Sequence, residues 1–273
     1  MSWMPPGPVW LFCPADRPDR YGKAAAVADV VILDLEDAVA PSDKEAARRS
    51  LIDTPLDPQR TVVRVNQSGT ADHEKDKQAL DATSYRRIML SKTESEKDVL
   101  DLMPREVVAL IESPRGALRT ECIAAAANTI GLMWGAEDLV AAIGGSSSRC
   151  ADGSYRDVAR QVRTSTLLAA KANERFVLDS VYLDIPDLPG LVDETLDAVA
   201  VGFDGKVAIH PTQVDKIRQT YAPSETEQDW ARRVLAAVAG ERGVFAFEGK
   251  MVDAPVLRHA ERIVRRGEAA RQR

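Results

Sequence analysis

Six short apolar runs in this chain end at side chains that could bind metal ions or anions, or transfer protons. These side chains are Asp34, Glu36 and Asp37; Arg64 and Asn66; Lys92; Glu112; Glu137 and Asp138; and His210. Short β-branched runs separated by helical stretches are typical of parallel strands buried on both faces. Because the carboxyl ends of the strands in a closed parallel barrel converge on one rim, we expect these side chains to gather there.

Glu112 and Asp138 end two consecutive runs, so we predict that they lie close together on that rim. Two carboxylates with open water positions suit Mg²⁺, which prefers oxygen ligands and usually keeps several waters. The alternative for each acid is structural: it caps the following helix or pairs with an arginine. Both acids together with Arg64 on one rim favour the metal site. A zinc site is not expected, because the chain has three histidines and no His-x-Glu spacing.

Arg64 follows a buried apolar run, where an unpaired charge would be costly. Its guanidinium must therefore pair with rim acids or with a ligand, and its planar fork matches a carboxylate or the oxygen of a developing enolate. Ion pairing with Glu36 or Asp37 alone is equally consistent with the sequence. In the functional interpretation, these two acids orient Arg64 or metal-bound water.

Two further features could bind anions. Gly135 and Ala136 precede helix-forming residues, and backbone N–H groups at a helix start favour a carboxylate or a phosphate. A glycine there also lets a ligand approach the backbone closely. The cluster Arg17, Arg20 and Lys23 could hold a phosphorylated small molecule, and a solvated helix face is the alternative.

The element pattern predicts eight strands, at residues 10–15, 30–36, 61–66, 87–91, 107–113, 129–135, 177–185 and 205–210. Helical stretches separate them, including 187–200 and 42–52, where Ser42 and Glu45 are placed as a capping box. This alternation closes into an α/β fold of the (β/α)8 TIM-barrel type. An open doubly wound sheet is the alternative, but no G-x-G-x-x-G motif follows the first strand.

Two segments break this rhythm. The Gly/Ser-rich connection 144–153 is long enough to predict a functional loop, and a helical stretch follows at 155–174. After the eighth strand the chain continues with a helix at 224–239, a turn-rich segment at 245–255 and a helix at 256–266. We therefore expect a barrel domain, 1–222, and a C-terminal helical extension or lid, 223–273.

Composition narrows the function classes. The 273 residues carry a net charge of −6, which gives no support to nucleic-acid binding. Three cysteines without metal or redox spacing favour a reducing compartment. No run approaches the roughly 20 apolar residues of a membrane span, and the first ten residues lack the apolar core of a signal peptide. We expect a cytoplasmic protein that acts on small molecules.

Seven strings, spread in order over nearly the whole chain, resemble one family. They are LFCPADRP (11–18), LDLEDAV (33–39), VRVN (63–66), IES (111–113), GAEDL (135–139), GKVAIHP (205–211) and GKMVDAP (249–255). Together they are similar to the citrate lyase β-subunit-like proteins of the malyl-CoA lyase and HpcH/HpaI aldolase superfamily. The resemblance implies a (β/α)8 barrel, assembled as a homotrimer, that makes or breaks a C–C bond next to a CoA thioester using Mg²⁺, with Mn²⁺ as the alternative cation.

The resemblance also implies roles for particular residues. Glu112 and Asp138 match the metal ligands, and Arg64 matches the residue that faces the substrate oxygens. The backbone of Gly135, Ala136 and Glu137 matches a cradle for the substrate carboxylate. Arg17 and Lys23 match contacts to the CoA phosphates, and Asp253 matches an acid/base that the C-terminal extension delivers into a neighbouring subunit. Two strings depart from the family pattern: Ser91-Lys92 stands in place of Pro-Lys, and Cys13-Pro14-Ala15 in place of Val-Pro-Gly.

We therefore expect a stand-alone, Mg²⁺-dependent β-hydroxyacyl-CoA lyase. It would cleave or form the bond between a 2-oxo acid and acetyl-CoA, with citramalyl-CoA, malyl-CoA or 3-hydroxy-3-methylglutaryl-CoA as candidate substrates. One alternative is a partner-dependent citryl lyase subunit of a citrate lyase complex. The other is a CoA-independent 2-oxo acid aldolase, which would not need Arg17 and Lys23.

Overall fold

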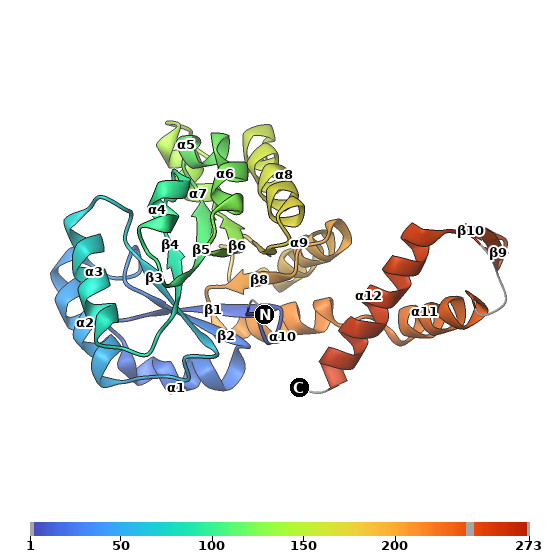
Figure 1. The fold of residues 1–273 in the computed structure, drawn as a ribbon, viewed down its shortest axis with the longest axis horizontal. Coiled ribbons are helices and arrows are strands. Elements are labelled where there is room, and N and C mark those ends of the chain that lie inside the picture. Colours follow the sequence, from blue (N-terminus) through green and yellow to red (C-terminus); the bar gives the residue numbers. More distant parts are fainter. Residues whose placement is uncertain (1–2, 239–242, 272–273) are drawn as a thin grey trace. The chain divides into compact units, whose positions relative to one another are not determined.

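The computed structural model describes residues 3–238 and 243–271. Its first compact unit, Met1–Ile217, is built on a closed barrel of eight parallel strands that follow one another in chain order (Figure 1). Closure is made by β1 and β8, where Trp10 pairs with Val207. The predicted (β/α)8 barrel is confirmed. The strands are β1 Val9–Pro14, β2 Val30–Asp34, β3 Thr61–Val65, β4 Arg87–Leu90, β5 Glu106–Ile111, β6 Thr129–Trp134, β7 Phe176–Asp179 and β8 Gly205–Ala208.

The seventh strand is shorter than predicted. It ends at Asp179, whereas the apolar pattern extended it to residue 185. The next carbonyl groups find side-chain donors instead of a neighbouring strand: the Ser180 carbonyl accepts from Lys206 Nζ at 2.8 Å, and the Tyr182 carbonyl from Gln213 Nε2 at 2.8 Å. Backbone groups satisfied in this way need no sheet partner, so the segment leaves the barrel early.

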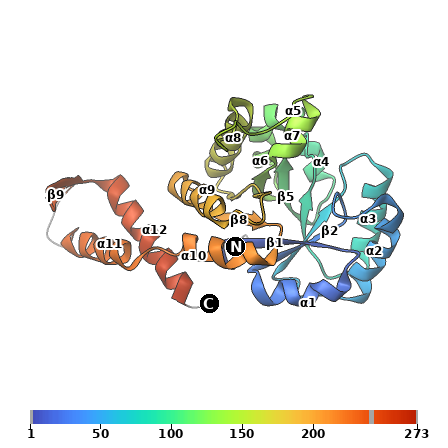
Figure 2. The same ribbon diagram turned by 180° about the vertical axis from the view of Figure 1, so that it is seen from behind.

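Helices follow most of the strands and cover the outside of the barrel (Figures 1 and 2). They are α1 Pro18–Val27, α2 Lys44–Asp53, α3 Ala71–Asp81, α4 Glu96–Leu100, α5 Pro114–Leu118, α6 Thr120–Ala125, α7 Ala136–Ala142, α8 Asp157–Ala172, α9 Leu188–Val201 and α10 Pro211–Tyr221.

The predicted capping box at Ser42 and Glu45 is wrong. The chain forms a 3-10 turn at Pro41–Asp43, and α2 begins only at Lys44. The Ser42 hydroxyl donates to Asp43 rather than accepting from the helix backbone, and Glu45 pairs with Arg48. Because of this turn, the helix begins after Ser42, the residue that the sequence pattern predicted as its cap.

Apolar side chains from all eight strands fill the interior of the barrel. The buried members of this cluster are Trp10, Val30, Ile32, Val62, Met89, Val108, Leu110, Ile130, Met133, Phe176, Leu178 and Val207. Each fully buried aliphatic or aromatic side chain contributes roughly 1.5–3 kcal/mol to folding. The interior is therefore a packed core rather than a channel, and a site must lie at a rim.

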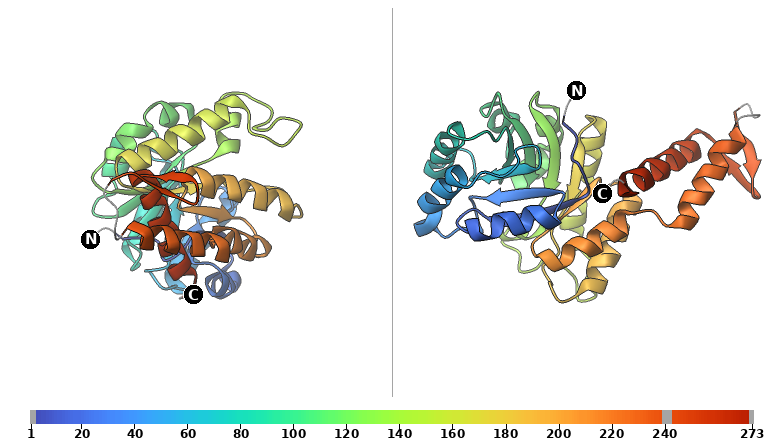
Figure 3. Two further views of the ribbon diagram at one scale, coloured as in Figure 1. Left: turned by 90° about the vertical axis from the view of Figure 1, so that its right-hand side faces the viewer. Right: turned by 90° about the horizontal axis from the view of Figure 1, so that it is seen from below.

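The second compact unit, Arg218–Arg273, consists of α11 Glu225–Ala237, the strands β9 Phe245–Phe247 and β10 Lys250–Val252, and α12 Ala254–Arg271. Figure 3 shows the two helices packed side by side and joined at one end by the antiparallel hairpin. The segment predicted to be rich in turns lies between the two helices, as expected, and it forms a hairpin of two short strands. Helix α12 is longer than predicted. Residue 239, the expected end of the first tail helix, lies outside the described residues.

Within residues 3–238 and 243–271, every helix is either too short or too polar to cross a membrane.

Candidate active site at the barrel rim

Arg64 lies near the carboxyl end of β3 and is only 8% exposed. Strand register places it beside Asp34 of β2, and the two form a bidentate pair: Nε to Oδ1 at 2.7 Å and NH2 to Oδ2 at 2.6 Å. NH1 also pairs with Glu36 Oε2 at 3.0 Å, and the guanidinium carbon lies 4.5 Å from the centre of the Phe12 ring. Although burial works against the cation, Asp34 and Glu36 raise the pKa of Arg64. The predicted pairing with Glu36 is present, but the main partner is Asp34.

Asp34 was named by the sequence pattern without a role, and the structure supplies one. Its two oxygens accept from the backbone N–H groups of Glu36 at 2.9 Å and Ala38 at 3.1 Å, while also holding Arg64. A completely buried carboxylate with four donors is fully satisfied. Asp34 therefore ties the turn after β2 to Arg64 and sets the direction in which that guanidinium points.

Glu112 follows β5 and is 3% exposed. Its Oε1 accepts the backbone N–H of Lys92 at 2.9 Å. Burial, followed by repulsion from Asp138 and Glu36, raises the pKa of Glu112 to about 8, and the nearby cations Lys92 and Arg64 do not cancel this rise. A carboxylate in this condition gains from any additional positive charge placed beside it.

Gly135 makes room for Glu112. A Cβ atom at position 135 would lie 2.6 Å from Glu112 Oε2 and 2.9 Å from its Cβ, so any larger residue would collide with the acid. The N–H of Gly135 donates to the Ile111 carbonyl at 3.0 Å as part of the sheet. This corrects the sequence prediction: Gly135 cannot offer that N–H to a ligand carboxylate, and its contribution is the absence of a side chain.

The cradle that remains is the first turn of α7. Ala136 is buried there and Glu137 is exposed. The Glu137 carboxylate accepts from the hydroxyl of Ser148 at 2.6 Å. Ser148 belongs to the Gly/Ser-rich connection predicted as a functional loop, so the structure links this loop to the predicted cradle.

Lys92, like Asp34, was named by the sequence pattern without a role. Its side-chain nitrogen contacts three carboxylates: Glu36, Asp37 at 3.2 Å and Asp138 at 3.2 Å. Burial opposes the charge of the ammonium, but the hydrogen bond to Glu36 and the surrounding acids raise its pKa. Burial also raises the pKa of Glu36 despite the opposing effect of Arg64 and Lys92. The available signal was the position of Lys92, two residues after the end of β4, at the same rim.

Arg17 and Lys23 lie at the start and in the body of α1, which follows the carboxyl end of β1. Both are exposed, and Arg17 pairs with Asp19 at 3.1 Å. Their placement is compatible with phosphate contacts and equally with a solvated helix face. His210, also exposed, contacts Thr212 through Nδ1 at 2.8 Å, which gives it a local role at the start of α10.

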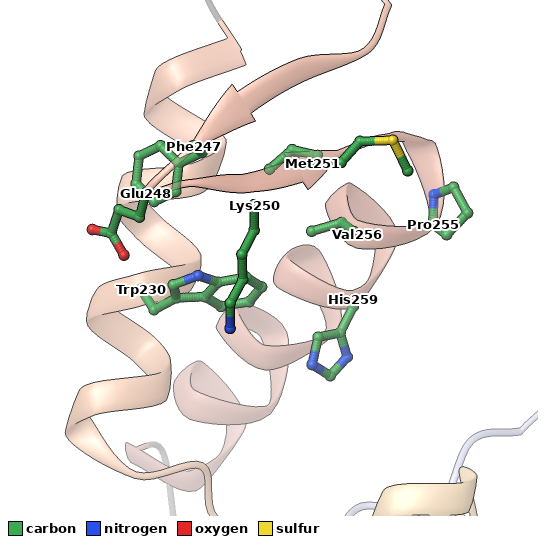
Figure 4. A pocket seen from close by; sticks show the side chains of 9 residues that line it. Trp230, Phe247, Glu248, Lys250, Met251, Pro255, Val256 and His259 are labelled. Carbon is green, nitrogen blue, oxygen red and sulfur yellow. The ribbon is translucent and has the colours of Figure 1, made fainter.

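Asp253 lies in the second unit, between β10 and α12. Its Oδ1 accepts from the Val256 N–H at 3.3 Å, so it caps α12. It also borders a cavity of about 560 Å³ beside the hairpin. A second cavity of about 480 Å³ in this unit is lined by aromatic and apolar residues together with Glu248, Lys250 and His259, and Figure 4 shows Lys250 extending there toward Trp230.

The donor set at the barrel rim fits a hard divalent cation. Glu112 and Asp138 offer carboxylate oxygens, the ligand type that Mg²⁺ prefers. Asp34, Glu36 and Asp37 add negative charge at this rim. Arg64 and Lys92 form ion pairs with these acids and balance part of that charge. Among residues 3–238 and 243–271, no three His, Cys, Asp or Glu side chains form a ready-made metal cage. A cation here would thus be held by two carboxylates and would keep positions for water or substrate.

A (β/α)8 barrel with a buried, acid-rich site at its carboxyl rim defines an enzyme of the TIM-barrel class. The family model of the HpcH/HpaI aldolase/citrate lyase proteins matches residues 9–211, and the chain belongs to this family. The protein is therefore a lyase. The family resemblance noted in the sequence is confirmed.

Similar proteins support this assignment. The citrate lyase subunit β-like protein of Mycobacterium tuberculosis is 62% identical over 264 residues, covering 96% of this chain and 97% of that protein. A crystal structure of CitE from M. tuberculosis in complex with magnesium, acetoacetate and coenzyme A superimposes with a TM-score of 0.94 at 61% identity, covering 96% and 98% of the two chains. Citrate lyase subunit β of Escherichia coli K12 is 36% identical, with 88% and 86% covered. The mitochondrial citramalyl-CoA lyase of Homo sapiens is 27% identical, with 93% and 83% covered.

Proposed function

We propose that this protein is a Mg²⁺-dependent β-hydroxyacyl-CoA lyase that cleaves or forms the C–C bond between a 2-oxo acid and acetyl-CoA. The observation that carries the proposal is the convergence of Glu112 and Asp138 on Lys92, beside Arg64, at one end of the barrel. The M. tuberculosis structure with magnesium, acetoacetate and coenzyme A, at 61% identity, supports the same ligand classes for this chain.

In this proposal, Glu112 and Asp138 hold the cation, with Mn²⁺ as the alternative to Mg²⁺. When bound, the cation supplies Lewis-acid polarisation of the substrate oxygens and a template for their orientation. The pKa of Glu112, raised to about 8, makes the site a stronger binder of divalent cations as the pH rises, because the bound form requires the ionised acid.

The 2-oxo acid portion of the substrate lies against the first turn of α7. The N–H groups of Ala136 and Glu137 bind its carboxylate, and Gly135 keeps the approach open. Arg64 stabilises the negative charge that develops as the C–C bond breaks. Asp34 and Glu36 occupy three of its five N–H donors, so Glu36 acts on the reaction by orienting Arg64.

In cleavage the substrate hydroxyl loses its proton to water and becomes the carbonyl of the 2-oxo acid, while the electron pair of the broken C–C bond remains on the acetyl-CoA fragment as an enolate. Asp253 then donates a proton to the methylene carbon, and in condensation it removes one from the acetyl methyl group. The extension 223–273 carries Asp253 to the rim of a neighbouring subunit in a homotrimer, and Arg17 and Lys23 contact the CoA phosphates.

A substrate panel tests the proposal. Purified protein is assayed with malyl-, citramalyl-, 3-hydroxy-3-methylglutaryl- and citryl-CoA, each with Mg²⁺ and with EDTA. We expect turnover of at least one thioester, lost in EDTA and restored by Mg²⁺. Malyl-, citramalyl- and citryl-CoA would release a 2-oxo acid, whereas 3-hydroxy-3-methylglutaryl-CoA would release acetoacetate, a 3-oxo acid, and so tests a wider substrate range. Undiminished turnover in EDTA, or the absence of turnover with all four thioesters, contradicts the proposed function.

A partner-dependent citryl lyase subunit is the second candidate, because relatives such as the 36% identical E. coli protein are named citrate lyase subunit β. Turnover by the isolated chain excludes this candidate. A CoA-independent aldolase is excluded if CoA protects Arg17 and Lys23 from chemical modification.

A further inference from the structure

Lys92 has an unusual backbone. It adopts φ +46°, in the left-handed region that few residues other than glycine occupy. Such a conformation persists where the surroundings enforce it, and it recurs at functional sites. Here it lets one residue contact the acid cluster twice: the backbone N–H donates to Glu112 at 2.9 Å, and the ammonium pairs with Asp138 at 3.2 Å. Both acids are the cation ligands of the proposed function.

The ammonium occupies a position that a cation would also favour. Its side chain is 24% exposed, and it contacts Glu36 and Asp37 in addition to Asp138. Lysine carries a compact point charge, which resembles a small metal ion more closely than the planar arginine fork does. Arg64 is committed to Asp34 and Glu36, and the Lys44 ammonium to the Leu35 and Glu36 carbonyls. Lys92 is the cation that pairs with Asp138.

We infer that Lys92 is a positioning residue that serves as a built-in counter-ion and competes with the divalent cation for Asp138. Without the cation, the ammonium holds Asp138, Glu36 and Asp37 together. When the cation binds, Asp138 turns toward it, while Glu36 and Asp37 keep the ammonium. The inference rests on the proposed function, because it takes Glu112 and Asp138 as the cation ligands.

The competition predicts opposite effects on cation binding and on the stability of the cation-free protein. Removing the positive charge should tighten Mg²⁺ binding by about tenfold or more, because two charges a few ångströms apart interact strongly in a partly buried site. It should also lower the melting temperature in EDTA, since the acids lose their counter-ion. A lysine whose role is only to hold the ligands in place would give weaker Mg²⁺ binding when removed.

The experiment is isothermal titration of the purified protein with Mg²⁺, together with thermal melting in EDTA and in saturating Mg²⁺. Lys92→Met removes the charge, and Lys92→Asn does so with a residue that tolerates a positive φ. Lys92→Arg retains the charge and should bind Mg²⁺ close to the wild-type affinity. Lys97→Met is the matched control, because this exposed lysine on α4 pairs only locally with Asp101, and it should leave the affinity unchanged.

Tighter Mg²⁺ binding by both neutral variants, with a larger Mg²⁺-induced rise in melting temperature than in the wild type, supports the inference. Unchanged or weaker binding by folded Lys92→Met and Lys92→Asn overturns it while leaving the proposed function standing. A wild-type protein that takes up no Mg²⁺ overturns the proposed function itself, and the inference with it.

Discussion

Replacing Glu112 by glutamine should make the cation-free protein more stable while destroying its response to Mg²⁺. Glu112 is almost completely buried and faces Asp138 and Glu36, so its ionised form is unfavourable in the folded state. Glutamine has nearly the same shape, and its carbonyl can still accept the N–H of Lys92. The change therefore removes the electrostatic penalty with little change in packing.

The size of the effect follows from the shift in pKa. Glu112 titrates near 4.5 in an unfolded chain and at about 8 in the folded, cation-free protein. Because the folded pKa is raised, the stability associated with the neutral acid is fully present below about pH 4.5 and is lost as the pH rises toward 8. Each pH unit in this window costs about 1.4 kcal/mol, so the upper bound at pH 7 is about 3 kcal/mol. We expect Glu112→Gln to raise the free energy of unfolding by about 2–3 kcal/mol at pH 7.

Urea denaturation in EDTA at pH 4.5, 7 and 8.5 measures this difference. The gain should vanish at the lowest pH and be largest at pH 8.5, and only the wild type should gain stability from Mg²⁺. Glu121→Gln, at an exposed acid on α6, is the control and should change little at any pH. If Glu112→Gln is less stable than the wild type at pH 7 in EDTA, the electrostatic account of this site is wrong.

Three further outcomes are expected. Arg64→Lys keeps the charge but loses the bidentate pair with Asp34, so kcat should fall on the order of a hundredfold in the lyase assay; an unchanged kcat would leave Arg64 a structural ion-pair partner. Gly135→Ala places a Cβ 2.6 Å from Glu112 Oε2, so calorimetry should show lost Mg²⁺ affinity, with a cost of about 1–3 kcal/mol in urea unfolding; wild-type affinity would refute the steric argument. Asp253→Asn should bind Mg²⁺ but not turn over, and reassembly with inactive Glu112→Ala subunits should restore part of the activity; mixed assemblies that remain inactive would show that Asp253 is not supplied between subunits.

The barrel could be predicted because its strands are locally encoded. Buried parallel strands are continuous apolar runs that end where polar rim residues begin, so composition alone locates them to within a few residues. The prediction failed where the outcome depended on distant partners. Strand β7 ends at Asp179 because side chains of Lys206 and Gln213 satisfy the carbonyls that follow, and α2 starts late because a 3-10 turn precedes it.

The residues of the candidate site could be predicted from the sequence, but the contacts between them could not. The rule that strand ends share one rim was enough to group Arg64, Glu112 and Asp138 before any geometry was known. The same rule pointed to Lys92 but could not show that it contacts three acids. The helix-start argument offered the Gly135 N–H to a ligand, but only the structure shows that this N–H donates to the Ile111 carbonyl.

The sequence by itself therefore determined the order of strands and helices, the chemical types at the rim and the family. Tertiary structure alone decided which of these groups touch. The pairing of Asp34 with Arg64 follows from the register of β2 against β3, and the contact of Lys92 with Glu36 spans 56 positions of the chain. Local periodicity carries no information about register or barrel closure, whereas ion pairs and pKa values depend on distances of a few ångströms that only the closed barrel sets.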